Sequence, residues 1–507
     1  MTEYNNILII KLIMGSNIKS KSSKKYVSSK KYLSSKKSKK VKSKSKSISK
    51  SLSKSLSSSS NEDLVYQMAK LQHIKPNTIF SPLYVYSNPI HHTIIRHDEA
   101  REEYNRAIKT IGNYDKYEIP EISYYYKSRE LSDSLLDRYS KLENQDKAMA
   151  SKVKKSTEGF ARGIAKYVMK NYKLQHPISN GFTKLWEILH IIPQVIPNKS
   201  DLNLFHLAEA PGQWIHTMNH YFSTSDMVEV DDYDWRATSL NAKHPTNIKK
   251  YGKDLFGDIY GFIANWKENW IWGADNTGDI INTKNQKWYK DYVSKWLSEK
   301  QNKKVDVILG DGGLGTDDTP LIDLQKLELA QLVTTVSVGT MNSNCIIKHF
   351  LPYYYANPDT IHANGFYTSL IFIYCLLFKE VNLIKPVSSS PNSSEFYVVC
   401  MGFNKKIGDI LYPKLLECLK NLKENECLFP EDTMPKSYVN QFLAFIQSIT
   451  NLNDRNRVLK CAAYTCLGKA SSEFKNSVNC SKYLSPVKLE ELQDKRFKMW
   501  VKKMNFV

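Results

Sequence analysis

Residues 381–401 read VNLIKPVSSSPNSSEFYVVCM, and this stretch constrains the fold more than any other. Two apolar runs, Val381–Ile384 and Phe396–Met401, flank Lys385–Glu395, which is rich in serine and proline and shows no helical pattern. A parallel crossover needs roughly a dozen residues or more, usually with a helix. The two runs are therefore predicted to pair as antiparallel strands, and Glu395 would open the second of them.

Upstream of this hairpin, strand and helix signals alternate. Predicted strands cover Leu204–Glu209, Met227–Val230, Val305–Leu309 and Cys345–Ile347, and the amphipathic stretch Leu321–Val336 predicts a helix between the last two. This alternation indicates an α/β fold with a mostly parallel sheet. We therefore expect a Rossmann-like sheet that ends in an antiparallel hairpin.

The first of these strands runs into the turn Ala210-Pro211-Gly212-Gln213-Trp214. A tight turn from a strand into a helix directs backbone N–H groups and the positive end of the helix dipole toward a ligand. Gly212 allows the backbone to approach that ligand closely. An ordinary turn would look the same. The turn is not G-x-G-x-x-G, which disfavours the pyrophosphate-binding site of a dehydrogenase.

Charged residues stand at the ends of three later strands. Asp311 follows Val305–Leu309 between glycines, Lys348 ends the strand that begins at Cys345, and Glu395 opens the last strand. Ligands of open α/β sheets bind outside the carboxyl ends of the strands. Asp311 is accordingly either a site residue or a turn former.

Two other acidic segments also have two interpretations. The turn Asp231–Trp235, after the second predicted strand, either takes ribose hydroxyls or is a solvated turn. Asp279 in the segment Trp272–Ile280 could accept a hydrogen bond from an adenine amine, although composition alone indicates a turn.

Seven segments, in this order and spacing, resemble the FtsJ-type ribose methyltransferases, and within them the Adrift-type cap methyltransferase 2 family. They are GFTKLWEIL (181–189), HLAEAPGQWIHTMNHY (206–221), WRATSLN (235–241), WGADNTGDI (272–280), VILGDGG (307–313), CIIKHF (345–350) and NSSEFYVVC (392–400). The pairing of EAPG with a downstream DNTGDI is similar to the cap family and unlike the ribosomal one. A terminal antiparallel hairpin also distinguishes a methyltransferase sheet from a dinucleotide-binding sheet.

The resemblance implies an mRNA cap 2′-O-ribose methyltransferase that uses S-adenosylmethionine. The family's catalytic tetrad would fall on Lys184, Asp311, Lys348 and Glu395. The cofactor loop would consist of Glu209, Ala210, Pro211, Gly212, Gln213 and Trp214, with further cofactor contacts from Tyr233, Asp279 and Asp311. Gln213 departs from the family pattern, because many relatives carry a small residue there.

Lys348 is the candidate base for the ribose hydroxyl. A free lysine titrates near pH 10.4, so burial, Lys184 and the positive sulfur of the cofactor would have to lower its pKa. This chemistry requires no metal ion.

Capped mRNA is the implied substrate, and the sequence names no protein partner. Basic residues that could line an RNA-binding surface, or simply be solvated, are Lys243, Lys249, Lys250, Lys495, Arg496 and Lys498. Two alternatives remain open: an FtsJ-like methyltransferase of ribosomal or transfer RNA, and a catalytically inactive RNA-binding subunit with the same fold.

Composition divides the rest of the chain. Residues 19–54 hold fifteen lysines and no acid, out of a formal net charge of +21. Residues 1–60 are therefore predicted to be a disordered Ser/Lys-rich tail. We expect residues 61–160 to form a mostly helical extension, residues 161–405 the methyltransferase domain, and residues 406–507 a second helical extension.

The apolar and cysteine content points to a cytoplasmic or nuclear protein. None of the eight cysteines forms a C-x-x-C pair, so we expect free cysteines in a reducing compartment and no zinc site. We find no secretory signal and no run near the roughly 20 apolar residues that span a membrane. The run Leu370–Phe378 predicts a buried helix. The abundant Lys, Asn, Ile and Tyr hint at a large DNA virus, which would add the virion or viral factory as locations.

Overall fold

A computed structural model of the chain describes residues 60–79, 91–97, 102–127, 146–157, 159–174, 176–252, 257–313, 319–351, 359–468, 470–480 and 486–506. Residues Ser60–Val507 form one compact unit. The predicted Ser/Lys-rich tail lies outside the described residues, apart from Ser60 at its end.

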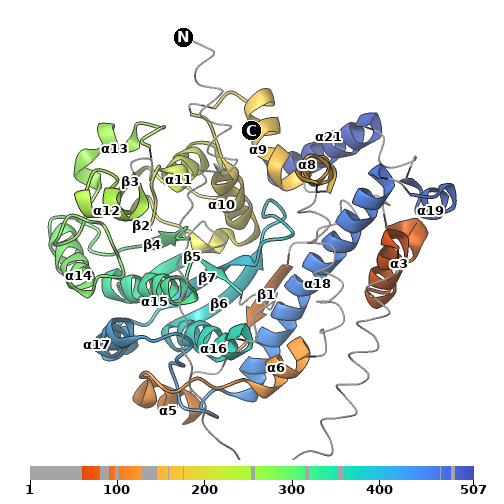
Figure 1. Cartoon of the computed structure of the whole chain (residues 1–507). Coiled ribbons are helices and arrows are strands. Elements are labelled where there is room, and N and C mark those ends of the chain that lie inside the picture. The colour runs from red at the N-terminus through yellow and green to blue at the C-terminus, as the bar shows by residue number, and fades with distance from the viewer. Residues whose placement is uncertain are drawn as a thin grey trace, which may run out of the picture. The chain divides into compact units, whose positions relative to one another are not determined.

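One mixed sheet of seven strands, in the order β1-β6-β7-β5-β4-β2-β3, forms the centre of this unit (Figure 1). The strands are β1 (His91–Ile95), β2 (Asp201–Leu207), β3 (Asp232–Thr238), β4 (Val307–Gly310), β5 (Asn344–Phe350), β6 (Phe378–Lys385) and β7 (Glu395–Phe403). Strands β3, β2, β4 and β5 run parallel. Strand β7 is antiparallel to both β5 and β6, which confirms the predicted fold class and its terminal hairpin.

The second predicted strand, Met227–Val230, was wrong. The strand in this place is β3, which begins at Asp232 and pairs Trp235 with Leu204 of β2. Trp235 and Ala237 are buried, whereas the two valines of the predicted strand are only partly buried at the edge of the core. The sequence MVEV is more typical of a strand. The segment that enters the sheet is nevertheless the one that buries Trp235 and Ala237 on the same face.

Helices cover both faces of the sheet, because successive side chains of a strand point to opposite faces. In β2, Phe205 and Leu207 belong to one buried cluster, and Leu202 and Leu204 belong to the other. The first cluster includes side chains of α14 (Thr283–Ser298), α15 (Leu321–Val338), α16 (Asp359–Leu377) and α17 (Lys405–Asn421). The second includes side chains of α9 (Gly159–Asn171), α10 (Asn180–Ile191) and α11 (Gln213–Thr224).

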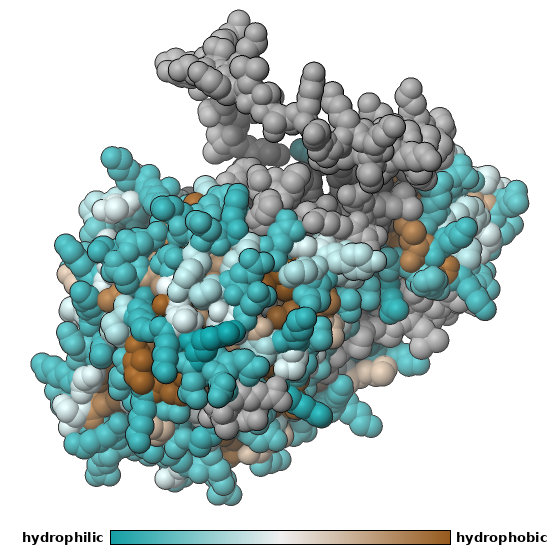
Figure 2. All heavy atoms as spheres, turned by 90° about the horizontal axis from the view of Figure 1, so that it is seen from below, coloured by the Kyte–Doolittle hydropathy of each residue, from teal (hydrophilic) through white to brown (hydrophobic). Residues whose placement is uncertain are grey.

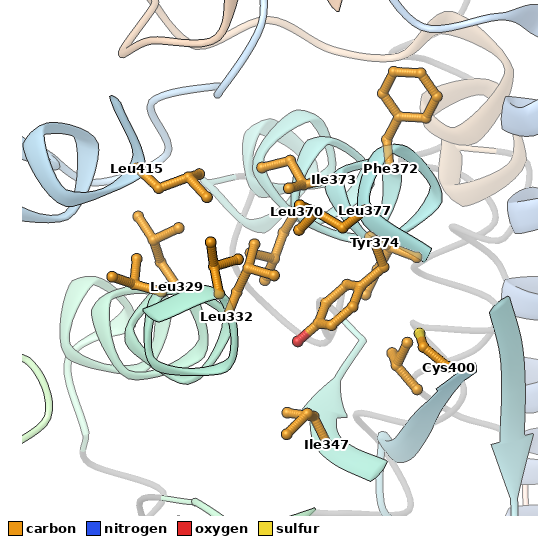
Figure 3. Packing of buried hydrophobic residues seen from close by; sticks show 14 of the residues in the cluster. Leu329, Leu332, Ile347, Leu370, Phe372, Ile373, Tyr374, Leu377, Cys400 and Leu415 are labelled. Carbon is orange, nitrogen blue, oxygen red and sulfur yellow. The ribbon is translucent and has the colours of Figure 1, made fainter. Parts of the chain in front are cut away.

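Figure 3 shows part of the first cluster, where Leu329 and Leu332 of α15, Leu370 and Tyr374 of α16 and Ile347 of β5 lie together. The predicted buried helix is confirmed: α16 carries this run to Leu377, and Phe378 begins β6.

The flanking segments contribute to the same unit. The described part of the N-terminal segment contains the helices α3 (Asn61–Leu71), α5 (Glu102–Thr110), α6 (Pro120–Lys127) and α8 (Lys147–Thr157), with the short 3-10 helix η1 (Pro76–Thr78). It also supplies β1, an unpredicted strand that pairs antiparallel with β6. After the sheet come α18 (Lys436–Leu467), α19 (Ser472–Ser477) and α21 (Pro486–Lys503). The indole N–H of Trp186 in α10 donates to the carbonyl of Met504 at 3.0 Å, so the C-terminal end contacts α10.

Short elements complete the description: η2 (Pro193–Val195), α12 (Pro245–Tyr251), α13 (Phe262–Asn265) and η3 (Lys267–Asn269). Six cysteines are free and buried, but a disulfide joins Cys466 to Cys480, which contradicts the prediction of free cysteines throughout.

Hydrophilic side chains cover most of the described surface visible in Figure 2, and hydrophobic ones are scattered in small groups. Among the described helices, none combines the length and the apolar character needed to traverse a bilayer.

Candidate active site

Four elements bring the predicted tetrad together. Lys184 lies on α10, Asp311 directly follows β4, Lys348 lies near the end of β5, and Glu395 is the first residue of β7. Because β7 is antiparallel to β5, with Glu395 opposite Phe350, the start of β7 lies beside the carboxyl end of β5. The tetrad therefore assembles at the edge where such sheets bind ligands.

Two lysine–carboxylate pairs form this group. The Nζ atom of Lys184 lies 2.6 Å from Oε1 of Glu395, and Nζ of Lys348 lies 3.1 Å from Oδ1 of Asp311. The hydroxyl of Tyr397 donates to the same Oδ1 at 3.4 Å. Charges taken out of water need partners of opposite sign, and each lysine here has one.

The two pairs act as one electrostatic unit. Burial alone would lower the pKa of Lys184, but the carboxylates of Glu395 and Asp311 outweigh it and raise that pKa. Burial alone would raise the pKa of Glu395, but Lys184, Lys385 and Lys348 hold it below its usual value. The pair Lys184–Glu395 is therefore ionised at neutral pH.

Gln331 on α15 links the loop after β4 to β5 by two hydrogen bonds. Its side-chain oxygen accepts the N–H of Gly312 at 3.1 Å, and its amide donates to the carbonyl of Lys348 at 3.2 Å. A Cβ at Gly312 would lie 2.5 Å from this oxygen, and one at Gly313 would lie 3.1 Å from Nζ of Lys348. The glycines after Asp311 thus make room for Gln331 and Lys348.

The loop after β2 is shaped by Glu209. Its Oε1 accepts the backbone N–H groups of Trp214 at 2.8 Å and Ile215 at 3.1 Å, and its Oε2 lies 3.1 Å from Nδ1 of His206. These two amides are occupied within the chain, contrary to the expectation that the start of the helix offers its N–H groups to a ligand. The buried carboxylate of Glu209 thus supports the backbone of the loop.

Gly212 places the loop against α13. Its φ of 110° is in the left-handed region, and a Cβ there would lie 2.6 Å from the ring of Phe262. Only glycine fits this position. The preceding Ala210–Pro211 peptide bond is cis.

The segment Trp272–Ile280 docks on the carboxyl end of β3. The backbone N–H of Asn241 donates to the carbonyl of Thr277 at 2.8 Å. Gly278 has φ 71°, and a Cβ on it would lie 1.7 Å from the carbonyl oxygen of Ser239. The glycine of the motif is therefore required for contact between this segment and the edge of the sheet.

The two aspartates of this segment differ in their surroundings. Asp275 accepts hydrogen bonds from the backbone and hydroxyl of Thr277 and from the side chains of Asn282 and Asn285. Asp279 accepts the N–H of Ile281 at 2.9 Å, and burial raises the pKa of its carboxyl group. Asp275 organises the loop, and Asp279 lies one residue beyond the glycine that touches β3.

Residues 177–403, which contain the tetrad and these loops, match the model of the FtsJ-like methyltransferase family. This segment is an FtsJ-like methyltransferase domain.

Three curated relatives are each 27% identical to the chain over the part that aligns with it. The chain is 27% identical over 305 residues to an uncharacterised protein of Acanthamoeba polyphaga mimivirus. This alignment covers 59% of the chain and 35% of that protein. The chain is also 27% identical over 277 residues to cap-specific mRNA (nucleoside-2′-O-)-methyltransferase 2 of Drosophila melanogaster, with coverages of 54% and 36%. A probable methyltransferase of African swine fever virus is 27% identical over 252 residues, with coverages of 47% and 52%. The chain thus spans about a third to a half of the length of these relatives.

Gln213, the departure from the family pattern, connects two parts of the FtsJ-like domain. Its side-chain oxygen accepts the N–H of Ser179, the residue that caps α10, and its amide donates to the carbonyl of Pro177 at 3.4 Å. The indole N–H of Trp214 donates to the carbonyl of Gly181 at 3.2 Å. The loop after β2 therefore holds the start of the helix that carries Lys184.

Tyr233 is not brought to this edge of the FtsJ-like domain. It is the second residue of β3, opposite Leu202, and its ring lies 4.9 Å from that of Phe222. The carboxyl end of β3, with Thr238, is the end that meets the loops described above. We therefore do not retain the expected ribose-edge contact of Tyr233.

Sequence reasoning missed four supporting residues: Tyr397, Gln331, Lys385 and Ser389. Lys385 had a usable signal, because it is the last residue of the apolar strand β6, and Lys348 lies near the end of β5. Gln331 and Ser389 had none, because their roles depend on which backbone groups lie beside them. Within the described ranges, no group of three or more His, Cys, Asp or Glu side chains could hold a metal ion.

Proposed function

We propose that the chain is an mRNA cap 2′-O-ribose methyltransferase that uses S-adenosylmethionine. The observation that carries the proposal is the pair of lysine–carboxylate contacts, Lys184–Glu395 and Lys348–Asp311, at the carboxyl edge of an FtsJ-like sheet. The names of the curated relatives support the cap as the substrate. Capped mRNA would put the activity in the nucleus, the cytoplasm or, for a viral protein, the viral factory.

The loops after β2, β3 and β4 fit an adenosyl cofactor. Each brings glycine backbone to the same edge, at Gly212, Gly278 and Gly312. Asp279, the residue after Gly278, adds a carboxyl group whose pKa is raised by burial. Bound S-adenosylmethionine supplies a methyl group on a positively charged sulfur. In this proposal the segment Glu209–Trp214 and Asp311 surround the cofactor, with Glu209 acting through the backbone that it holds.

In this proposal the two lysines of the tetrad have different roles at the ribose hydroxyl. Lys184, whose pKa is raised, stays an ammonium group and holds the 2′-oxygen by a charge-assisted hydrogen bond. Lys348, once it has lost its own proton to solvent, takes the proton of the hydroxyl, while Asp311 keeps its side chain at the edge. Alignment of the hydroxyl with the methyl group supplies a further part of the rate.

RNA would approach over α12. Lys250 on this helix interacts electrostatically with Asp279, which places a basic helix beside the cofactor loop. The C-terminal candidates are weaker, because Lys498 pairs with Asp494 at 2.7 Å and Arg496 stacks over Phe160. We therefore propose Lys243, Lys249 and Lys250 as the RNA-contacting set.

The test is methyl transfer from labelled cofactor to short RNAs that share one sequence. The RNAs would carry a cap, a cap with nucleotide one already methylated, or a 5′ triphosphate. We expect transfer only to capped RNAs. Equal transfer to capped and uncapped RNA would favour a ribosomal or transfer RNA enzyme, and cofactor binding without transfer to any RNA would favour an inactive subunit.

A further inference from the structure

Lys385, the last residue of β6, is a buried cation outside the tetrad. Its side chain is 1% exposed. Its Nζ donates to the hydroxyl of Ser389 at 2.9 Å, the carbonyl of Ser393 at 2.8 Å and the carbonyl of Glu395 at 2.9 Å. Three acceptors match the three N–H groups of an ammonium ion.

These contacts lead to the tetrad through one hydroxyl group. Ser389 accepts from Lys385 and donates its own proton to Oε1 of Glu395 at 2.7 Å. The same Oε1 lies 2.6 Å from Nζ of Lys184. A chain of contacts therefore runs from Lys385 through Ser389 and Glu395 to Lys184.

The hairpin loop between β6 and β7 is held from its other side by α10. Glu187, one turn after Lys184, accepts the backbone N–H groups of Val387 at 2.6 Å and Ser388 at 3.0 Å. The loop is thus fixed by Lys385 at its base and by the helix that carries Lys184. Its conformation and the position of Glu395 are coupled.

Charges of both signs surround Lys385. Glu395 comes from β7, Lys184 from α10, and His91 from β1, where it is the register partner of Lys385. Burial, Lys385 and Arg455 of α18 together lower the pKa of His91 to about 4, so this histidine is neutral at pH 7. Burial lowers the pKa of Lys385 itself to about 7, with Glu395 opposing and Lys184 adding to the effect.

We propose that Lys385 is a positioning residue of the site, whose buried ammonium group orients Ser389 and the start of β7 so that Glu395 faces Lys184. The inference rests on the proposed methyl transfer. It adds a fifth charged side chain, which touches neither substrate nor cofactor and acts through Glu395.

The first experiment compares the wild type with Lys385→Met and Ser389→Ala in the pH dependence of kcat. Loss of a hydrogen bond to a charged group should lower kcat by roughly tenfold in Lys385→Met, with KM for cofactor and RNA within about twofold. Lys385 carries its charge below its pKa of about 7. The loss of kcat in Lys385→Met relative to the wild type should therefore be largest below pH 7 and should shrink above it, where the wild-type side chain is itself neutral.

Ser389→Ala separates orientation from charge, because it removes the hydroxyl relay and keeps the cation. We expect a smaller loss of kcat, whose size does not change between pH 6 and pH 8. Lys199→Met is the matched control, since Lys199 pairs with Asp306 at the opposite end of β4 and its loss should leave kcat unchanged.

Wild-type kcat and pH profile in Lys385→Met would overturn the inference. If that variant does not fold, wild-type kcat in Ser389→Ala would overturn it instead. If the wild type binds cofactor but methylates no RNA, the proposed function is wrong, and the positioning role of Lys385 is tested in another way. The melting temperatures of Lys385→Met, Glu395→Gln and the double variant would then decide: non-additive shifts support the coupling, and additive shifts refute it.

Discussion

The two halves of the site use charged side chains in opposite ways. In the proposed catalytic half, made of Lys184, Asp311, Lys348 and Glu395, charged groups face one another at the edge of the sheet. In the proposed cofactor half, made of the loops 208–214 and 272–280, the carboxylates of Glu209 and Asp275 accept hydrogen bonds from groups of their own loop. A carboxylate therefore pairs with a lysine in one half, and in the other half it holds groups of its own loop.

Lys348→Ala tests the catalytic half and should have the largest effect. Loss of a general base costs about 10²–10⁴-fold in rate, so methyl transfer should fall below detection in a routine assay. Cofactor affinity by calorimetry should stay within about twofold, because side-chain removal leaves the backbone contact to Gln331 in place. Appreciable remaining turnover would take Lys348 out of the role of base.

Gly278→Ala tests the cofactor half through backbone alone. A Cβ at this position would lie 1.7 Å from the carbonyl of Ser239, so the loop must move away from β3. We expect cofactor affinity to fall about 100-fold, because a displacement of about 1 Å in a site can cost a factor of this size. Gly252→Ala is the matched control: its φ of 92° is also left-handed, but nothing lies within 4 Å of the added Cβ. Equal losses in both variants would show that backbone strain, and not docking on β3, is responsible.

This contrast explains what the sequence could and could not reveal. The hairpin and the alternation of strands and helices follow from residue type and order, whereas the four positions of the tetrad, including Lys184 on a helix, came from the resemblance to the FtsJ-type family. The start of β3 could not be read, because the apolar segment before it packs at the edge of the core. The roles of Glu209 and Gln213 could not be read either, because they depend on which amides come within reach after folding.

Gln213→Ala tests whether the halves communicate. The variant removes the contacts to Ser179 and Pro177, so the start of α10 loses part of its attachment to the cofactor loop. With about 0.5–1.5 kcal/mol for each hydrogen bond, we expect both cofactor affinity and kcat to fall by roughly three- to tenfold. A loss confined to cofactor affinity, with kcat unchanged, would separate the two halves.

Acid stability probes the pair Lys184–Glu395. The pKa of folded Glu395 lies below that of an unfolded glutamate, so the pair stabilises the fold above the unfolded pKa of about 4.3 and loses this effect as the pH falls further. The pKa of Lys184 is raised in the folded protein. Its contribution to stability is therefore full below the unfolded lysine pKa of about 10.4 and is lost only above that pH. The melting temperature of Glu395→Gln should thus lie below that of the wild type at pH 7, and the gap should narrow toward pH 3. A difference in melting temperature that does not change with pH would mean that the ionised pair Lys184–Glu395 does not cause it.

Tyr233→Phe should have the smallest effect, and it tests whether this residue contacts the cofactor. Tyr233 is at the amino end of β3, opposite Leu202, and the loops of the proposed site follow the carboxyl end of that strand at Thr238. The phenylalanine ring keeps the contact with Phe222, so we expect cofactor affinity and kcat within about twofold of wild type and a stability change of about 0.5 kcal/mol. A tenfold loss of cofactor affinity would return Tyr233 to the ribose edge and shift the register of β3. Such a shift would also separate Ser239 from Gly278, so the same measurement bears on the docking contact of the whole cofactor half.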